Sequence, residues 1–139
     1  MEHSRLEVVK AIYDAFARGD VPTVLGAFDL QIRWSEAEGY AYADGNPYMG
    51  PQAVALGVFQ RLVSDVAEFA VVPQNFIDGG DTIVVEGRYR GLMKATGTRL
   101  DAQFAHVWQV REGKVIRFQQ YTDTRQWEEA RVGTVPAGG

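Results

Sequence analysis

The sequence predicts an α+β fold, a cone in which three N-terminal helices pack on a curved, mainly antiparallel β-sheet and enclose a pocket. Two observations lead to this prediction. As far as residue 65, apolar residues recur every three or four positions, which is the period of amphipathic helices. Beyond that point, apolar and polar residues alternate along stretches separated by glycine-bearing turns, which is typical of an antiparallel meander.

The first helix should begin near His3 or Ser4 and end at Arg18, where Gly19 can adopt the left-handed conformation of a helix cap. Its apolar positions lie three and four residues apart and are Leu6, Val9, Ile12, Tyr13 and Phe16. Asp20 should then cap a second, short helix. The two helices are therefore expected to lie antiparallel with a short joint.

A short strand is expected at residues 31–35, followed by an irregular stretch at residues 36–50. That stretch is long and carries three tyrosines, Tyr40, Tyr42 and Tyr48. Loops of this length inside a compact domain are often functional, although this one could equally be a flap that only covers the core. A third helix should open at Gly50 and Pro51 and end near Asp65.

Four strands are predicted in the second half of the chain, at residues 68–77, 82–92, 98–110 and 114–122. In the strand at residues 98–110, Phe104, His106, Trp108 and Val110 share one face. A titratable histidine in an apolar wall is a candidate for acid–base chemistry, but it can also be a packed core residue.

The turn before Lys114 allows two strand registers. A two-residue loop pairs Arg111 with Lys114 and places His106 opposite Gln119. A three-residue loop with a bulge pairs Val110 with Lys114 and places His106 opposite Phe118. The second register separates the apolar from the polar side chains more cleanly, so it is preferred.

The composition indicates one globular domain at residues 1–130, followed by a flexible tail at residues 131–139. The net charge is −4 and no basic cluster stands out, so nucleic-acid binding is not expected. No apolar run approaches the roughly 20 residues that span a membrane, and the N-terminus lacks a signal-peptide pattern. The expected location is the cytoplasm, without membrane insertion.

The chain has no cysteine and two histidines, His3 and His106. This excludes disulfides, thiol nucleophiles and a histidine-rich metal centre. A carboxylate site for a hard cation stays open, but no loop has the dense Asp and Asn spacing that such a site needs. Neither a metal ion nor a cofactor is expected.

The order of elements and several local motifs resemble the nuclear-transport-factor-2-like superfamily, in its SnoaL-like and ketosteroid-isomerase-like branch. The motifs are Phe16-Ala17-Arg18-Gly19-Asp20, Ile32-Arg33-Trp34, Tyr48-Met49-Gly50-Pro51, His106-Val107-Trp108, Glu112-Gly113-Lys114-Val115 and Tyr121-Thr122-Asp123. The resemblance spans about residues 7–123. It implies a cone-shaped fold with a pocket, on which isomerases, cyclases, hydrolases, dehydratases and non-catalytic binders are all known.

Carried over residue by residue, the resemblance implies a site around His106. This residue stands where ketosteroid isomerases keep an aspartic acid that donates a hydrogen bond to the forming oxyanion. Ile12, next to Tyr13, matches the first-helix tyrosine of those isomerases, and Glu36 lies near their general base. Gln120 occupies the place of the catalytic aspartate of SnoaL-like cyclases and could orient a substrate carbonyl.

His106 and Glu36 are therefore the candidate catalytic residues. The candidate substrate-binding residues are Trp34, Phe59, Phe104, Trp108, Phe118 and Gln120. The leading hypothesis is a pocket for a small apolar molecule that bears a carbonyl or a ring, with acid–base isomerase, cyclase or hydrolase chemistry. The alternative is a non-catalytic ligand-binding or dimeric accessory protein of the same fold.

A homodimer is expected under either hypothesis. The predicted outer face of the sheet carries Ala105, Val107, Val115 and Tyr121 among polar residues. Such a mixed surface could pair with its copy.

Overall fold

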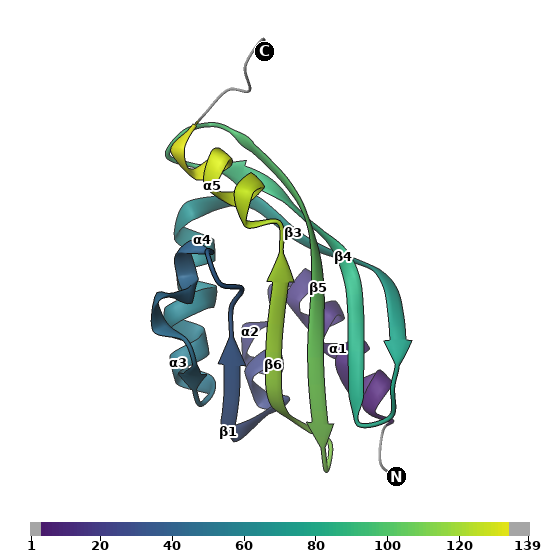
Figure 1. Cartoon of the computed structure of the whole chain (residues 1–139). Helices are drawn as coiled ribbons and strands as arrows, with labels where there is room; N and C mark the ends of the chain where they lie inside the picture. The colour runs from purple at the N-terminus through teal and green to yellow at the C-terminus, as the bar shows by residue number, and fades with distance from the viewer. Residues whose placement is uncertain (1–3, 134–139) are drawn as a thin grey trace.

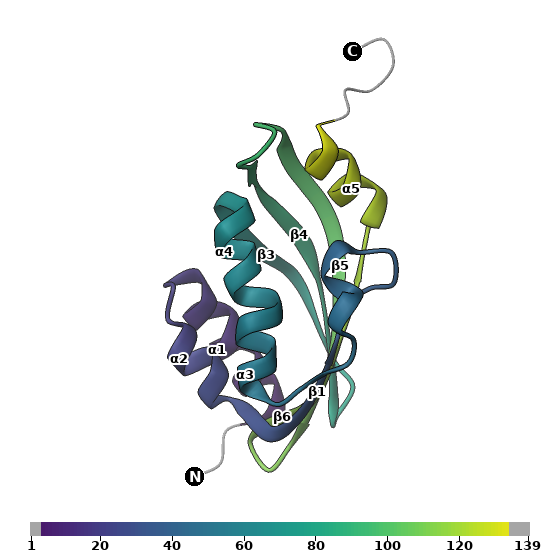
Figure 2. The same cartoon turned by 90° about the vertical axis from the view of Figure 1, so that its left-hand side faces the viewer.

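Helices from the N-terminal half of the chain cover one face of a curved six-stranded sheet in the computed structural model, which describes residues 4–133 (Figures 1 and 2). The helical elements are α1 (Arg5–Ala17), α2 (Val21–Gly26), η1 (Ala41–Gly45), α3 (Pro51–Val54), η2 (Ala55–Phe59), α4 (Gln60–Asp65) and α5 (Thr124–Val132). The strands are β1 (Phe28–Ser35), β2 (Tyr48–Met49), β3 (Val66–Asp78), β4 (Thr82–Met93), β5 (Arg99–Arg111) and β6 (Lys114–Thr122). These elements confirm the α+β fold class.

The first helix begins and ends as predicted, and the second begins at the predicted cap but ends at Gly26, so that Phe28 belongs to β1. The Ser4 side chain caps α1 by accepting a hydrogen bond from the Glu7 backbone N–H at 3.1 Å. Gly19 follows with a φ of 72°, and Asp20 caps α2 by accepting from the Thr23 N–H at 3.2 Å. Each cap satisfies a backbone donor that the helix itself leaves free, so the boundaries were readable from the sequence.

The predicted third helix is one helical run that contains a π-helical segment, η2, between α3 and α4. The wider turn leaves the Gly57 carbonyl oxygen free to accept from Tyr48 Oη at 3.5 Å and from Arg61 Nη1 at 3.3 Å. A Cβ at position 57 would lie 2.1 Å from the Tyr48 ring, so glycine is required for this close approach. The interruption was not predicted.

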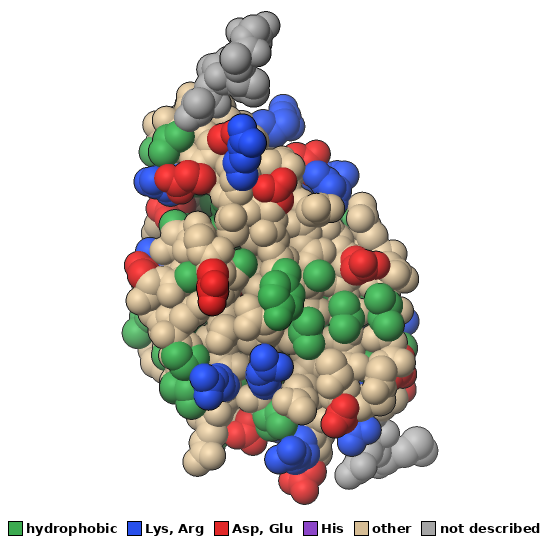
Figure 3. All heavy atoms as spheres, viewed as in Figure 1, with side chains coloured by type: hydrophobic (Ala, Val, Ile, Leu, Met, Phe, Trp, Pro, Cys, Tyr) green, Lys and Arg blue, Asp and Glu red, His purple; other side chains and the backbone are tan. Residues whose placement is uncertain are grey.

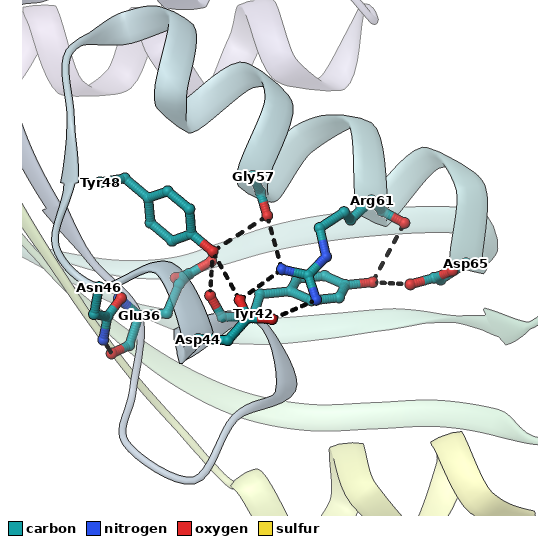
Figure 4. A network of polar contacts seen from close by, with 8 residues as sticks. All are labelled: Glu36, Tyr42, Asp44, Asn46, Tyr48, Gly57, Arg61 and Asp65. Atoms are coloured by element: carbon teal, nitrogen blue, oxygen red, sulfur yellow. Dashed lines mark hydrogen bonds and ion pairs between the residues drawn. The ribbon is translucent and has the colours of Figure 1, made fainter.

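The loop after β1 is fastened to this helical run (Figure 4). Arg61 pairs with Asp44 at 2.8 Å, and its guanidinium lies over the Tyr42 ring. The Tyr42 hydroxyl donates to Asp65, and Tyr48 Oη donates to the Tyr42 carbonyl at 2.6 Å. The tyrosine-rich loop is therefore an ordered part of the wall rather than a loose flap.

The sheet has the order β2-β1-β6-β5-β4-β3, with β1 parallel to β6 and all other neighbours antiparallel. The turn between β5 and β6 has two residues, Glu112 and Gly113, both with positive φ, and it pairs Arg111 with Lys114. The preferred three-residue loop was therefore wrong.

A bulge at Ile116 shifts the pairing beyond the turn. Val110 pairs with Val115 and Gln109 with Arg117, so Ile116 has no partner and His106 lies opposite Gln120. The bulge places Trp108, His106, Phe118 and Gln120 on the inner face, which is the grouping of the preferred register with different partners. Val115 turns inward and is fully buried, so its assignment to the outer face was wrong.

The outer face of the sheet still carries an apolar patch, visible across its middle in Figure 3. Ile77, Val84 and Val107 are neighbours across β3, β4 and β5. Ala105 pairs with Tyr121, which is 56% exposed.

The helix α5 was not predicted. It lies at the end of the sheet away from the Glu112–Gly113 turn (Figure 1), with Asp123 as its N-cap and Trp127 buried. It includes Arg131 and Val132, which the sequence analysis assigned to the tail, whereas residues 134–139 of that tail lie outside the described residues.

Candidate functional site

A small cavity of about 60 Å³ lies between the inner face of the sheet and the helices. Its wall is formed mainly by aromatic and aliphatic side chains. The lining residues are Ile12, Tyr13, Phe16, Val24, Trp34, Glu36, Tyr40, Val58, Phe59, Leu62, Phe69, Val71, Tyr89, His106, Trp108, Phe118, Gln120 and Trp127. Within this apolar wall, a few polar groups converge.

His106 is held between two tyrosines at the back of the cavity. Its Nδ1 lies 2.6 Å from Tyr13 Oη on α1, and its Nε2 lies 2.5 Å from Tyr89 Oη on β4. The Phe104 ring stacks on the imidazole with centroids 3.9 Å apart. Both ring nitrogens are thus engaged, and the ring plane is fixed.

The hydrogen-bond chain continues on both sides of this triad. Trp108 Nε1 donates to Tyr13 Oη at 2.9 Å, and Gln120 Nε2 donates to Tyr89 Oη at 2.8 Å. The Gln120 Oε1 accepts from the Ala37 backbone N–H at 3.1 Å. Side chains from α1, β4, β5 and β6 therefore form one buried polar chain.

His106 is neutral in this environment. Its side chain is buried, and burial lowers its pKa from 6.5 to about 3 because the charged imidazolium would lose its hydration. Burial likewise raises the pKa of Tyr13 and Tyr89 well above 10. The chain is therefore made of uncharged groups at neutral pH.

Among residues 4–133, Glu36 is the one carboxyl group that lines the cavity. It is 2% exposed, and burial raises its pKa from 4.5 to about 8, a shift that the Trp34 indole N–H and the charge of Arg61 partly oppose. Asn46 fixes the backbone at this point, because its side chain accepts from the Glu36 N–H at 2.9 Å and donates to the Glu36 carbonyl at 2.7 Å.

Trp34 contributes a further polar atom. Its indole stacks on Phe118 with centroids 3.7 Å apart, two residues before Glu36 on the same strand face. Its Nε1–H is near enough to the Glu36 carboxyl group to lower the pKa of that group, although among residues 4–133 no acceptor meets full hydrogen-bond geometry with it.

The structure brings together most of the predicted site residues. His106, Glu36 and Gln120 line the cavity, as do the aromatic residues Trp34, Phe59, Trp108 and Phe118. Phe104 is not among the lining residues and lies behind His106.

Two polar lining residues were missed by the sequence analysis. Tyr13 was assigned only to the apolar stripe of the first helix, next to the position matched to the isomerase tyrosine. Tyr89 follows Ile83 and Val85 on the inner face of β4, so strand alternation alone would have placed it on the same face as His106.

A second, outer depression of about 510 Å³ adjoins the cavity. Tyr40 and Trp127, whose ring centroids are 4.8 Å apart, line both spaces. These two rings therefore form the wall between the cavity and the outer depression.

Within the described chain, no group of three or more His, Asp or Glu side chains is placed to hold a metal ion. No helix in residues 4–133 is long and apolar enough to cross a membrane.

A protein family described as the SnoaL-like domain matches residues 9–118. No curated protein matches the chain. Among solved structures, an NTF2-like protein from Burkholderia thailandensis E264 is 30% identical, with a TM-score of 0.88, over 92% of this chain and 97% of that one. TerC, co-crystallised with polyporic acid, is 25% identical, with a TM-score of 0.81, over 91% of this chain and 96% of that one.

A third solved structure is similar in fold alone. A protein from Catenulispora acidiphila DSM 44928, with a ketosteroid isomerase-like fold and in complex with trimethylamine, is 19% identical. Its TM-score is 0.70, over 83% of this chain and 84% of that one.

Proposed function

Since this chain belongs to the SnoaL-like domain family, we propose that its cavity takes a small apolar molecule bearing a carbonyl group or a ring. We further propose that Glu36 moves a proton on the carbon next to that carbonyl. The observation that carries the proposal is a buried carboxyl group that faces an otherwise apolar cavity.

The environment of Glu36 suits proton transfer. A group transfers protons in both directions most effectively when its pKa lies near the working pH, and burial raises the pKa of Glu36 to about 8. Asn46 fixes the Glu36 backbone directly after the end of β1, so the side chain starts from a defined position. An exposed loop carboxylate would have neither property.

In this proposal His106 is not the proton acceptor. With both nitrogens bonded to tyrosines and its pKa lowered to about 3 by burial, it does not take up a proton at neutral pH. It positions the Tyr13 and Tyr89 hydroxyl groups instead. Its place in the mechanism is thus to order the polar wall of the cavity.

The ligand must displace part of the wall. A cavity of about 60 Å³ is smaller than the roughly 150 Å³ that holds benzene in an apolar protein interior. Tyr40 and Trp127 separate the cavity from the outer depression, so their movement would join the two spaces. The co-crystallised TerC, 25% identical, supports small-molecule binding on this fold.

Proton exchange tests the proposal directly. Cyclic ketones such as 1-indanone, incubated with the protein in D₂O, should gain deuterium next to the carbonyl, as NMR can follow. Glu36→Gln should abolish the exchange, whereas Glu38→Gln, a change at an exposed carboxylate two residues away, should leave it unaffected. The rate should rise with pH up to about 8, as Glu36 ionises. Exchange that survives Glu36→Gln would contradict the proposal.

A non-catalytic binding protein is the second candidate. Two observations favour it. Within the described part of the chain, Glu36 is the only carboxyl group that lines the cavity, and both ring nitrogens of His106 are hydrogen-bonded to tyrosines. A protein that binds 1-indanone without catalysing any exchange would establish this alternative.

We also propose that the protein forms a homodimer through the outer sheet face. Its apolar patch runs across Ile77, Val84, Val107 and Tyr121, which would favour burial against a copy. Light scattering at micromolar concentration should give twice the monomer mass, and Tyr121→Glu should halve it. Val63→Glu, at an exposed position on α4, is the control and should leave the mass unchanged.

A further inference from the structure

The hydrogen-bond chain behind the cavity has a donor at each end. An indole N–H can only donate, so Trp108 Nε1 donates a hydrogen bond to Tyr13 Oη at 2.9 Å. At the other end, the Gln120 amide nitrogen donates to Tyr89 Oη at 2.8 Å. The orientation of that amide is fixed because its Oε1 accepts from the Ala37 N–H at 3.1 Å. The Tyr13 oxygen therefore accepts from Trp108, and the Tyr89 oxygen accepts from Gln120.

In the middle of this hydrogen-bond chain, the donor protons outnumber the hydrogen bonds by one. Two hydrogen bonds join His106 to its tyrosines, one at Nδ1 and one at Nε2. A neutral imidazole supplies one N–H, and Tyr13 and Tyr89 supply one O–H each, so three protons serve two bonds. One tyrosine proton is left without a partner inside the chain.

The tautomer of His106 decides which tyrosine keeps it. If Nδ1 carries the proton, it donates to Tyr13, Nε2 accepts from Tyr89, and the Tyr13 O–H is unused. If Nε2 carries the proton, the Tyr89 O–H is unused. Among residues 4–133, no acceptor forms a hydrogen bond with either hydroxyl beyond those already named.

We propose that this unused phenol O–H, on Tyr13 or Tyr89 according to the His106 tautomer, is the donor that binds an acceptor oxygen of the ligand. Both tyrosines line the cavity. The cavity therefore selects ketones, quinones and related molecules, in which an apolar frame carries an acceptor oxygen.

This inference rests on the proposed function only for the position of the ligand, and it requires no turnover. Its test is therefore a binding experiment, whereas the proposed function is tested by proton exchange. Glu36→Gln should abolish exchange and keep the binding preference described next. The proposed function and this inference can therefore fail separately.

The probes are acetophenone and α-methylstyrene, which have the same shape and differ in C=O against C=CH₂. The protein should bind acetophenone about tenfold more tightly, as one buried hydrogen bond would give. Tyr13→Phe/Tyr89→Phe should reduce the preference to about one. Tyr121→Phe, which removes a hydroxyl from the exposed outer face of the sheet, should keep it. A preference that survives the double variant, or no binding of either probe, would overturn the proposal.

Two measurements on proteins with both tyrosines intact guard against misfolding of the double variant. The C=O stretch of bound acetophenone should lie below its value in hexane, also in Trp34→Phe, because the phenol is the donor. A hexane-like frequency in Trp34→Phe would contradict the inference. The imidazole ¹⁵N signals come from two histidines only. They should show a neutral His106 whose tautomer population changes when acetophenone is added. A doubly protonated ring would also overturn it.

Discussion

Replacing the buried Glu36 by glutamine should make the protein's stability much less dependent on pH. The carboxyl group has a pKa of about 8 in the folded protein, against 4.5 when exposed, because burial penalises its charged form. Between these values the unfolded chain loses the Glu36 proton while the folded protein keeps it. The free energy of unfolding of the wild type therefore falls as pH rises from 4.5 to about 8.

The size of this effect follows from the two pKa values. Each pH unit in the window costs about 1.4 kcal/mol, so the wild type should lose ~4 kcal/mol relative to Glu36→Gln between pH 5 and pH 8. That is a large share of the ~5–15 kcal/mol that stabilises a typical domain. With a urea dependence of ~2 kcal/mol per molar, the midpoint should shift by about 2 M.

Urea unfolding at pH 5, 6, 7 and 8, followed by tryptophan fluorescence, measures the effect. The difference between wild type and Glu36→Gln is the relevant quantity, because other titrating groups are common to both proteins and cancel. Glu38→Gln, the same substitution at an exposed position two residues away, is the control. A flat difference for Glu36→Gln would refute a buried, neutral carboxyl group.

Three further predictions concern other parts of the structure. The free energy of unfolding of the wild type should fall by about 1.4 kcal/mol per pH unit from pH 6.5 down to about 3, because the unfolded chain takes up a proton that the buried imidazole does not bind. His106→Gln should remove this dependence, as acid unfolding curves can measure. Gly57→Ala should cost ~1–3 kcal/mol in urea unfolding, because its Cβ would lie 2.1 Å from the Tyr48 ring, whereas Gly26→Ala has open space and should cost little. Trp127→Ala should open the cavity to the outer depression, so that titration with 1-anilinonaphthalene-8-sulfonate shows stronger fluorescence than the wild type.

The helices and strands were predictable where single residues determine the local backbone. Ser4 and Asp20 cap helices because their oxygens accept from backbone donors, and the sequence shows such residues directly. The helix α5 escaped prediction although Asp123 is its cap. Its sequence is mostly polar, and the tertiary contact of Trp127 with Tyr40 and Tyr89 holds it in place.

The last hairpin shows why register was harder. The two-residue turn of one alternative and the inner-face grouping of the other both exist, because Ile116 bulges between them. Burial patterns report which face a side chain takes, but an extra residue in the strand changes pairing without leaving a sequence signal of its own.

The candidate site was predictable in its strands but not in its hydrogen bonds. His106, Glu36 and Gln120 follow from the resemblance and from alternation along the strands. The link from His106 to Tyr13 joins residues 93 positions apart and depends on how α1 is rotated against the sheet. No local pattern reports that rotation.

The bulge at Ile116 has a practical consequence for comparing this chain with its relatives. Pairing is regular on both sides of Ile116, so β6 could lose that residue and still present Phe118 and Gln120 to the cavity and Arg117 to solvent. A relative shorter by one residue here would keep the same interior. An alignment that placed the gap in the Glu112–Gly113 turn would shift Lys114 and Val115 by one position. The middle of a strand, rather than its turn, is then where homologous sequences of different length should be brought into register.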